Sequence, residues 1–117
     1  MVKFKVKPTL KENWRYISFE LLSETKISEK QIVSKILNSL LSFLGELGTS
    51  NANLWLIEYD SKTSSGIVRC SNKALTEVIA SLAIITSIGG SPMTFRVLGV
   101  SGTIKKTKDK YLNRKRK

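Results

Sequence analysis

The sequence predicts an α+β fold in which a four-stranded antiparallel sheet packs two helices against one of its faces. Two observations lead to this fold class. Four segments show the alternation or short apolar run of a strand, and two longer segments repeat apolar residues every three to four positions, as a helix does. The segments follow one another as strand–helix–strand–strand–helix–strand, and all fit within the 117 residues of a single domain.

The first strand is expected at residues 14–22. Its apolar residues alternate with polar ones, a period of two that is typical of a strand with one buried face: Ile17, Phe19 and Leu21. If these three side chains face the helices, the side chains between and beside them face the opposite way: Tyr16, Ser18 and Glu20.

A helix is expected to begin after Ser28. Ser28 and Gln31 have the spacing of a capping box, in which each side chain binds the backbone N–H of the other residue. Apolar residues then recur at helical spacing. Gly45 and Gly48 are expected to end this helix, which leaves residues 49–53 as a loop.

A hairpin is expected next. Residues 54–60 are rich in apolar and aromatic side chains, residues 66–70 form a second short strand, and the residues between them suit a turn. Alternation in the later strand turns two side chains outward: Ile67 and Arg69. The earlier strand is ambiguous, because both of its alternating sets are apolar enough for the core, but Glu58 is expected to face outward.

The second helix is expected after Ser71 or Asn72, since either side chain can cap a helix. Its apolar face runs over residues 74–85, and a Gly-Gly-Ser-Pro turn follows at residues 89–92. The last strand is expected at residues 93–100 with three side chains outward: Thr94, Arg96 and Leu98.

This order of elements predicts a ferredoxin-like, or RNA-recognition-motif-like, sandwich with the second sheet face open to a partner. RNA-recognition motifs stack bases on aromatic side chains of their two central strands. The strand at 66–70 has no aromatic residue, so we expect this face to suit a protein partner or solvent better than bases. Its candidate interface residues are Tyr16, Glu20, Glu58, Arg69 and Arg96. The alternative is that the two arginines only balance the two glutamates across strands.

The excess positive charge lies at the two ends of the chain. Residues 1–15 have a net charge of +4 and residues 105–117 a net charge of +7, whereas the residues between them are neutral overall. Clustered Lys and Arg attract a polyanion and release its counterions, so the charge pattern predicts a nucleic-acid partner. We divide the chain into one domain over residues 1–104, with a basic N-terminal arm (residues 1–15), and a basic C-terminal tail (residues 105–117).

Residues that the sequence lacks exclude several classes of function. There is no histidine, which excludes Ser-His and Cys-His nucleophile pairs. The single cysteine, Cys70, excludes an internal disulfide and a structural zinc site, and is expected to be a small core residue. We expect no catalytic residue, no metal site and no cofactor bound by the chain itself. Without a signal-like or membrane-length apolar run, the protein is expected to be cytoplasmic and to have no membrane partner.

Several motifs resemble one known family. The most specific is the run VLGVSGTIKK, from Val97 to Lys106. Supporting motifs are Lys7-Pro8-Thr9 followed by Arg15-Tyr16, the strand at 66–70, and the segment Gly45–Gly48, which has Glu46 where the family has Asp. From about Lys7 to Lys106 the chain resembles the family of archaeal ribonuclease P protein component 2, the counterpart of the eukaryotic Pop-five subunit.

The resemblance implies a non-catalytic subunit of ribonuclease P, the ribonucleoprotein that removes the 5′ leader from precursor tRNA. In that enzyme the catalyst is RNA with bound Mg²⁺, and this subunit supports the RNA together with the protein component 3 subunit. The implied partners are ribonuclease P RNA, component 3, precursor tRNA and a second copy of the chain. Leftover apolar residues are candidates for a protein interface: Leu47, Ile84 and Leu98.

Charge and resemblance together indicate the RNA-binding residues. They lie in the N-terminal arm, at the strand exit and in the tail: Lys7, Lys11, Arg15, Ser101, Gly102, Lys105, Lys106, Lys108, Lys110, Arg114, Lys115, Arg116 and Lys117. The alternatives are a merely solvated tail and an ordinary strand exit. At the level of the whole protein, the alternatives are a ribosomal or general RNA-binding protein and a small hydrolase related to acylphosphatase. The hydrolase would need a phosphate-binding glycine-rich loop, which is missing beside Arg15.

Overall fold

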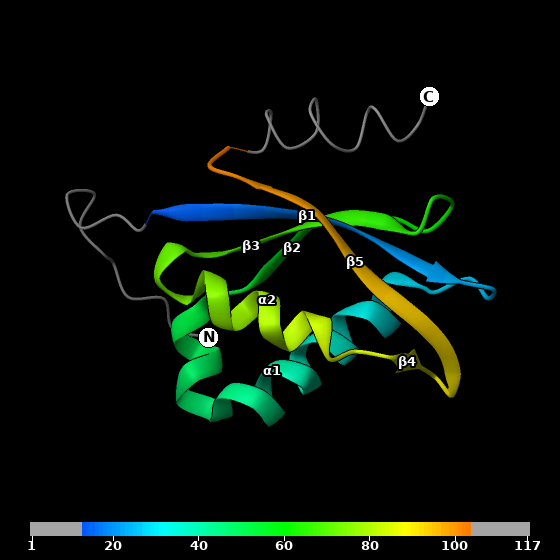
Figure 1. Cartoon of the computed structure of the whole chain (residues 1–117), viewed down its shortest axis with the longest axis horizontal. Helices are drawn as coiled ribbons and strands as arrows, with labels where there is room; N and C mark the ends of the chain where they lie inside the picture. Colours follow the sequence, from blue (N-terminus) through cyan, green and yellow to red (C-terminus); the bar gives the residue numbers. More distant parts are fainter. Residues whose placement is uncertain (1–12, 104–117) are drawn as a thin grey trace.

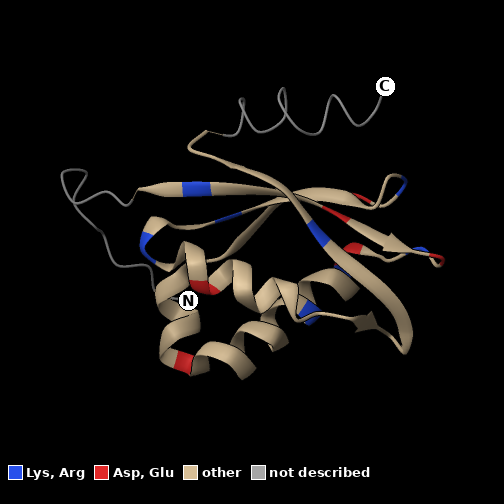
Figure 2. Ribbon diagram, in the orientation of Figure 1, with Lys and Arg blue, Asp and Glu red and all other residues tan. Residues whose placement is uncertain are grey.

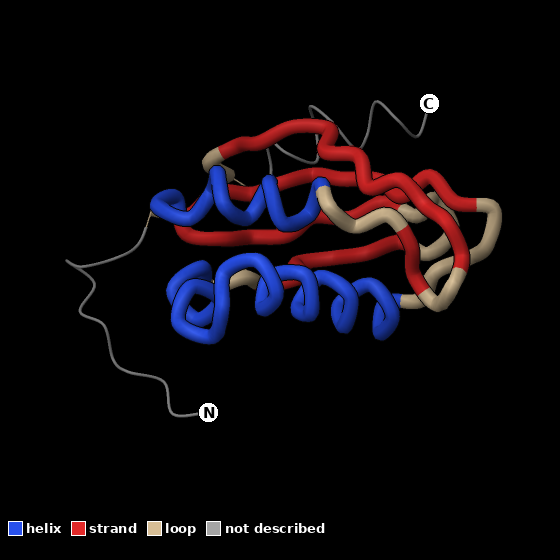
Figure 3. Tube along the Cα trace, turned by 60° about the horizontal axis from the view of Figure 1, so that its bottom comes forward, coloured by secondary structure: helices blue, strands red, loops and turns tan. Residues whose placement is uncertain are grey.

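The computed structural model describes residues 13–103, and it has a layer of β-sheet with two α-helices packed beneath it (Figures 1 and 3). The elements in chain order are β1 (Trp14–Ser23), α1 (Glu29–Ala52), β2 (Trp55–Asp60), β3 (Ser65–Ser71), the short 3₁₀ helix η2 (Asn72–Ala74), α2 (Leu75–Ala83), β4 (Ser87–Ile88) and β5 (Ser91–Ser101). The predicted α+β class, with both helices on one face of an antiparallel sheet, is confirmed.

The sheet has five strands in the order β2-β3-β1-β5-β4, so the prediction of four strands was wrong. The additional strand, β4, pairs with the start of β5 through a two-residue turn formed by Gly89 and Gly90. Both glycines have positive φ, 59° and 83°, a conformation that a tight hairpin requires and that side chains disfavour. The expected turn at residues 89–92 is therefore a hairpin loop with strand on both sides.

Two β-bulges determine which side chains face the helices. In the β1–β5 pair, Ser18 lies opposite Gly99 and Phe19 opposite Val97, so Leu98 is the extra residue. Because of it, Val97 and Val100 both pack against the core. Simple alternation does not predict this.

The second bulge lies in β2 and resolves the ambiguity of that strand. Leu56 pairs with Val68 and Glu58 with Ile67, so the extra residue is Ile57. The core side of β2 consists of Leu56 and Tyr59, whereas Trp55 is exposed.

The core lies between the sheet and the helices, as the alternation in β1 predicts. Ile17, Phe19 and Leu21 are all buried. The Phe19 ring stacks on that of Phe95, with centroids 4.8 Å apart. Gly66 is opposite Phe19, and a Cβ at Gly66 would collide with the carbonyl oxygen of Glu58 and lie 3.1 Å from the Phe19 ring. The close approach of β2 and β3 here therefore requires glycine.

The opposite face of the sheet is not open across its centre, which corrects the sequence-based expectation. Ser18 and Ile67 face away from the helices and have no exposed surface, and Glu20 is only 5% exposed. The Ser18 hydroxyl donates a hydrogen bond to the Gly99 carbonyl, which satisfies it without water. Accessible side chains on this face therefore belong to its two ends.

Helix α1 begins as predicted but ends later. The capping box is present: Gln31 N–H donates to the Ser28 hydroxyl at 3.2 Å, and Ser28 N–H donates to the Gln31 side chain at 3.0 Å. Gly45 interrupts the helix with φ 77°, but the chain then resumes helical geometry to Ala52. Asn53, in the left-handed conformation, ends it, so the predicted loop at residues 49–53 was wrong.

Helix α2 is preceded by η2, and neither residue predicted as its cap acts through a side chain. The Ser71 hydroxyl instead donates to the Asn51 carbonyl at 3.4 Å, linking β3 to the end of α1. The two helices are joined directly by Ser39, whose hydroxyl donates to the Ser81 carbonyl. Within residues 13–103 no helix has the length and apolar character needed to cross a membrane.

Candidate nucleic-acid interface

Both basic segments of the sequence are attached to one end of the sheet. Tyr16, near the start of β1, pairs with Ser101 at the end of β5. The chain therefore enters the fold and leaves it at the same place. Lys7, Lys11 and all predicted RNA-binding residues from Lys105 to Lys117 lie outside the described residues, so their predicted role stays a prediction.

The three predicted RNA-binding residues that the structure describes lie together at this end. The Arg15 guanidinium donates from Nη1 to the Trp14 carbonyl at 2.9 Å. The same atom lies beside Gly102, where a Cβ would be 3.8 Å from it. Ser101 accepts a hydrogen bond from the Thr103 N–H at 3.3 Å. This group places a cation and a tight backbone turn where the C-terminal basic segment begins.

Cys70 lies next to Arg15 in the sheet and is fully buried, as expected for a small core residue. Burial raises the pKa of its thiol to about 11, and the nearby Arg15 opposes the rise only in part. The thiol is therefore neutral at physiological pH, which makes it a poor nucleophile.

Arg69 lies over the ring of Trp14, with Trp55 nearby, and is not paired with a carboxylate among the described residues. Its guanidinium carbon lies 4.0 Å from the centroid of the Trp14 ring and 6.0 Å from that of Trp55. Arg69 is also directly opposite Tyr16 on β1 and opposite Trp55 on β2. We call these four residues the aromatic–arginine cluster: Trp14, Tyr16, Trp55 and Arg69.

The sequence analysis places Tyr16 and Arg69 at the candidate interface but gives the two tryptophans, Trp14 and Trp55, no role there. Alternation in β1 already places Trp14 on the same face as Tyr16, so this signal was available in the sequence. The position of Trp55 depends on the pairing of β2 with β3 and on the bulge at Ile57, which the sequence does not reveal.

Arg96 has a different environment, near the other end of the sheet. Its Nη1 atom lies 3.0 Å from Oε2 of Glu20, in a pair whose carboxylate side chain is 7% exposed and whose arginine side chain is 61% exposed. The cross-strand balance of Arg96 and Glu20 is confirmed. The predicted interface residues are thus divided between two places, because Arg69 belongs to the aromatic–arginine cluster.

The carboxylates of the sheet gather toward one end, where Arg96 and Lys62 partly balance them, whereas the other end carries basic residues (Figure 2). Arg15 and Arg69 lie toward the end where β1 begins, and Lys73 follows just after β3. The carboxylates of the strands lie toward the end with the β2–β3 turn: Glu20, Glu58 and Asp60. A polyanion is therefore attracted to the end where the basic segments are attached.

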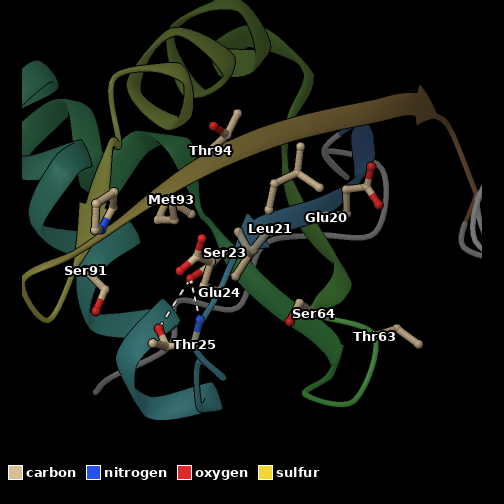
Figure 4. Close-up of a pocket in the computed structure, with 12 residues that line it drawn as sticks. Glu20, Leu21, Ser23, Glu24, Thr25, Thr63, Ser64, Ser91, Met93 and Thr94 are labelled. Carbon is tan, nitrogen blue, oxygen red and sulfur yellow. Dashed lines mark hydrogen bonds between the residues drawn. The ribbon is translucent and has the colours of Figure 1, made fainter.

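A pocket of about 810 Å³ opens at the acidic end, between the β2–β3 turn and the β1–β5 pair (Figure 4). Glu20 and Glu24 are among its lining residues, and the Ser23 hydroxyl accepts a hydrogen bond from the Thr25 N–H at 3.2 Å. In the part of the chain that is described, no three potential metal-ligating side chains are grouped. The carboxylates in its lining, of which Glu20 is paired with Arg96, disfavour an anion such as phosphate.

The helical side of the molecule exposes large apolar side chains. Four of them belong to α1: Leu37, Leu41, Phe43 and Leu47. Leu47 is 75% exposed, and Ile84, which follows α2, is 54% exposed. Leu98, the third residue predicted at a protein interface, is half-buried in the β5 bulge. Leu37 and Leu41 are neighbours on one face of α1, and adjoining exposed apolar groups favour contact with another protein.

Comparisons with known proteins agree on one family. Residues 15–112 match the Rpp14/Pop5 family. Ribonuclease P protein component 2 of Pyrococcus furiosus is 44% identical over 106 residues, which are 91% of this chain and 88% of the relative. Ribonuclease P protein component 2 of Methanocaldococcus jannaschii is 41% identical over 109 residues, 93% of this chain and 80% of the relative.

The fold also resembles a chain in the cryo-EM structure of yeast ribonuclease MRP. The TM-score is 0.66 over 83% of this chain and 79% of the yeast chain, at 19% sequence identity, which supports the fold alone. The family match and the archaeal relatives extend over most of the sequence, from the first strand into the basic tail. This chain belongs to the Rpp14/Pop5 family.

Proposed function

We propose that this protein is a non-catalytic subunit of ribonuclease P that supports the catalytic RNA during removal of the 5′ leader from precursor tRNA in the cytoplasm. Family membership and the archaeal relatives support this role. The observation that carries it is the attachment of both basic segments to the end of the sheet that holds Arg15. RNA with its bound Mg²⁺ would supply the chemistry, and the protein would supply positive charge.

Binding to RNA is expected to depend on charge and shape more than on base identity. Phosphate contacts position a protein and carry little sequence information. If about six residues of the basic segments contact phosphates, the logarithm of the binding constant should fall with the logarithm of salt concentration with a slope of about −4 to −5. A slope near zero would contradict a role for these segments.

The protein partner in this proposal is the component 3 subunit of ribonuclease P. Its site on this chain would be the helical side, where α1 exposes Leu37, Leu41 and Leu47. This surface lies on the opposite side of the sheet from the aromatic–arginine cluster, so protein and RNA would not compete for space. A second copy of this chain is the other occupant for the same surface, and sedimentation of the isolated protein would separate the two.

Precursor-tRNA cleavage by the matching catalytic RNA at low Mg²⁺ tests the proposal. The reaction is run with this protein, with component 3, and with both, and is repeated with residues 105–117 deleted. We expect full activity only with both proteins, and weaker activity after the deletion. If RNA is bound but no combination stimulates cleavage, the protein is instead a ribosomal or general RNA-binding protein.

A further inference from the structure

We propose that the aromatic–arginine cluster is a stacking site for an unpaired nucleotide of RNA, with the base on Trp55. The proposal rests on the proposed function, because it assumes that RNA is bound at this end of the sheet. It adds a contact of a different kind, since stacking uses the face of a base, whereas the basic segments use phosphate charge.

The cluster is already arranged for stacking. Arg69 lies 4.0 Å from the centroid of the Trp14 ring, a distance at which the guanidinium is held by the ring electrons. Trp55 lies on the neighbouring strand, with its ring centroid 6.0 Å from the Arg69 guanidinium, and its side chain is 55% exposed. A base stacked on the Trp55 ring would therefore be held beside this cation.

Trp55 is not needed for the core. In β2 the side chains that pack against the core belong to other residues, Leu56 and Tyr59. A Trp that leaves more than half of its surface in water gives up much of the hydrophobic stabilisation that its burial would provide. Exposed aromatic residues of this kind are enriched where proteins bind partners.

Arg69 keeps its charge available. Within residues 13–103 its only ion-pair or ring contacts are with the two tryptophans, and its Nε atom is buried without a hydrogen-bond partner. An arginine that is not neutralised by a carboxylate retains its attraction for an anion. The phosphate of a nucleotide stacked on Trp55 would be such an anion.

Charge complementarity favours RNA over a protein at this site. Arg15 and Arg69 lie on this end of the sheet, both basic segments are attached to it, and the strand carboxylates lie toward the other end. The nucleotide must be unpaired, because a base inside a duplex has no free face to offer. We expected little base stacking because β3 has no aromatic residue; in the structure, the rings come from β1 and β2 on either side of it.

The first test compares the full-length variants Trp55→Ala and Trp55→Phe with a matched control. The control is Phe43→Ala, which removes an exposed aromatic side chain, 49% exposed, from α1. The probe is a fluorescently labelled single-stranded oligouridylate. We expect Trp55→Ala to weaken binding about tenfold, within the range of base–aromatic stacking, and Trp55→Phe to retain most of the affinity. Phe43→Ala should bind as the unaltered protein does.

The salt dependence separates this proposal from the role of the basic segments. Stacking involves no counterion release, so Trp55→Ala should lower the affinity at every salt concentration and leave the slope unchanged. Deletion of residues 105–117 should instead reduce the slope. If Trp55→Ala equals Phe43→Ala while the deletion still reduces the slope, stacking is overturned and charge-driven binding stands. If neither change has an effect, both proposals fail.

A second measurement does not depend on how Trp55→Ala folds. In the variant Trp14→Phe, Trp55 is the sole tryptophan, because the chain has only two. Its fluorescence should be quenched by the single-stranded oligonucleotide and not by a blunt RNA duplex of the same length. Equal quenching by both RNAs would overturn the proposal. So would a blue shift caused by the component 3 protein without RNA, since Trp55 would then be part of a protein interface.

Discussion

The two ends of the sheet use arginine in opposite ways. Arg96 is paired with the buried carboxylate of Glu20 at 3.0 Å, so its charge is balanced within the fold. Arg69, on the same face, lies 4.0 Å from the centroid of the Trp14 ring and 6.0 Å from that of Trp55. Both residues project from strands that flank the central strand, β1. The difference shows that the neighbours on adjacent strands, and not the residue type, decide whether an arginine supports the fold or remains available to a ligand.

The largest expected effect concerns the tail at the basic end. Deletion of residues 105–117 removes eight positive charges and one negative charge. We expect the affinity for ribonuclease P RNA at low salt to fall by about 100-fold or more, because fewer counterions are released. Filter binding over a range of salt concentrations measures both the affinity and the slope. Reversal of Lys26, Lys30 and Lys35 to Glu, on or near α1, is the control for a general charge effect and should change the affinity much less.

The next effect concerns Cys70, which lies beneath the basic end. Its folded-state pKa of about 11 exceeds the reference value of 9.0, so the folded protein holds the thiol proton more tightly than the unfolded chain does. The contribution of the Cys70 thiol to the free energy of unfolding is therefore fully present below pH 9 and is lost as the pH rises through 11. We expect this loss to be about 2 kcal/mol. Burial also raises the pKa of Tyr59, which acts in the same direction at higher pH.

Urea unfolding at pH 8.5 and at pH 11 measures this loss. The control is Cys70→Ala, which lacks the titrating group but retains every lysine and tyrosine. The unaltered protein should lose more stability between the two pH values than the variant does. Parallel pH profiles for the two proteins would show that Cys70 does not titrate as described.

A smaller effect is expected from breaking the ion pair at the acidic end. Arg96→Gln leaves the carboxylate of Glu20, 5% exposed as a residue, without its arginine partner. We expect a loss of about 1 kcal/mol in the free energy of unfolding, because a buried charge loses part of its compensation. The double variant Glu20→Gln/Arg96→Gln should recover part of it. Thermal unfolding of the three variants measures the coupling, and additive losses would mean that the pair contributes nothing.

The smallest effect directly compares the two arginines. Arg69→Gln should weaken binding of single-stranded RNA by about fivefold, because the guanidinium layer and its charge are both lost. Arg96→Gln should leave RNA binding unchanged. The same oligonucleotide titration measures both variants. Equal losses of affinity in the two variants would show that Arg69 contributes no more to RNA binding than Arg96 does.

The sequence could predict the parts of the fold that depend on local rules. The capping box of Ser28 and Gln31 and the inward set Ile17, Phe19 and Leu21 follow from neighbouring residues alone, and all are confirmed. The family motifs could be identified as well, because each consists of neighbouring residues in the sequence. The Gly-Gly pair at 89–90 predicts a turn, and in the structure this turn joins the two strands of a hairpin.

What the sequence could not predict depends on register between strands. The bulge residues Ile57 and Leu98 have no local signature, yet they decide which side chains of β2 and β5 enter the core. Trp14, Arg69 and Trp55 come from three different strands. They lie close together only because β1 and β2 pair with β3 in the observed register. The continuation of α1 beyond Gly45 is similar, since packing of residues such as Ala52 overrides the break.

The bulge at Leu98 couples the interior of the protein to the orientation of the last residues of β5. If Leu98 were paired regularly instead of bulged, every later residue of β5 would face the opposite side of the sheet. Val100 would point away from the helices, and Ser101 would take its place against them. A single bulged residue therefore places Val100 against the core and turns Ser101 away from it at the end of the strand.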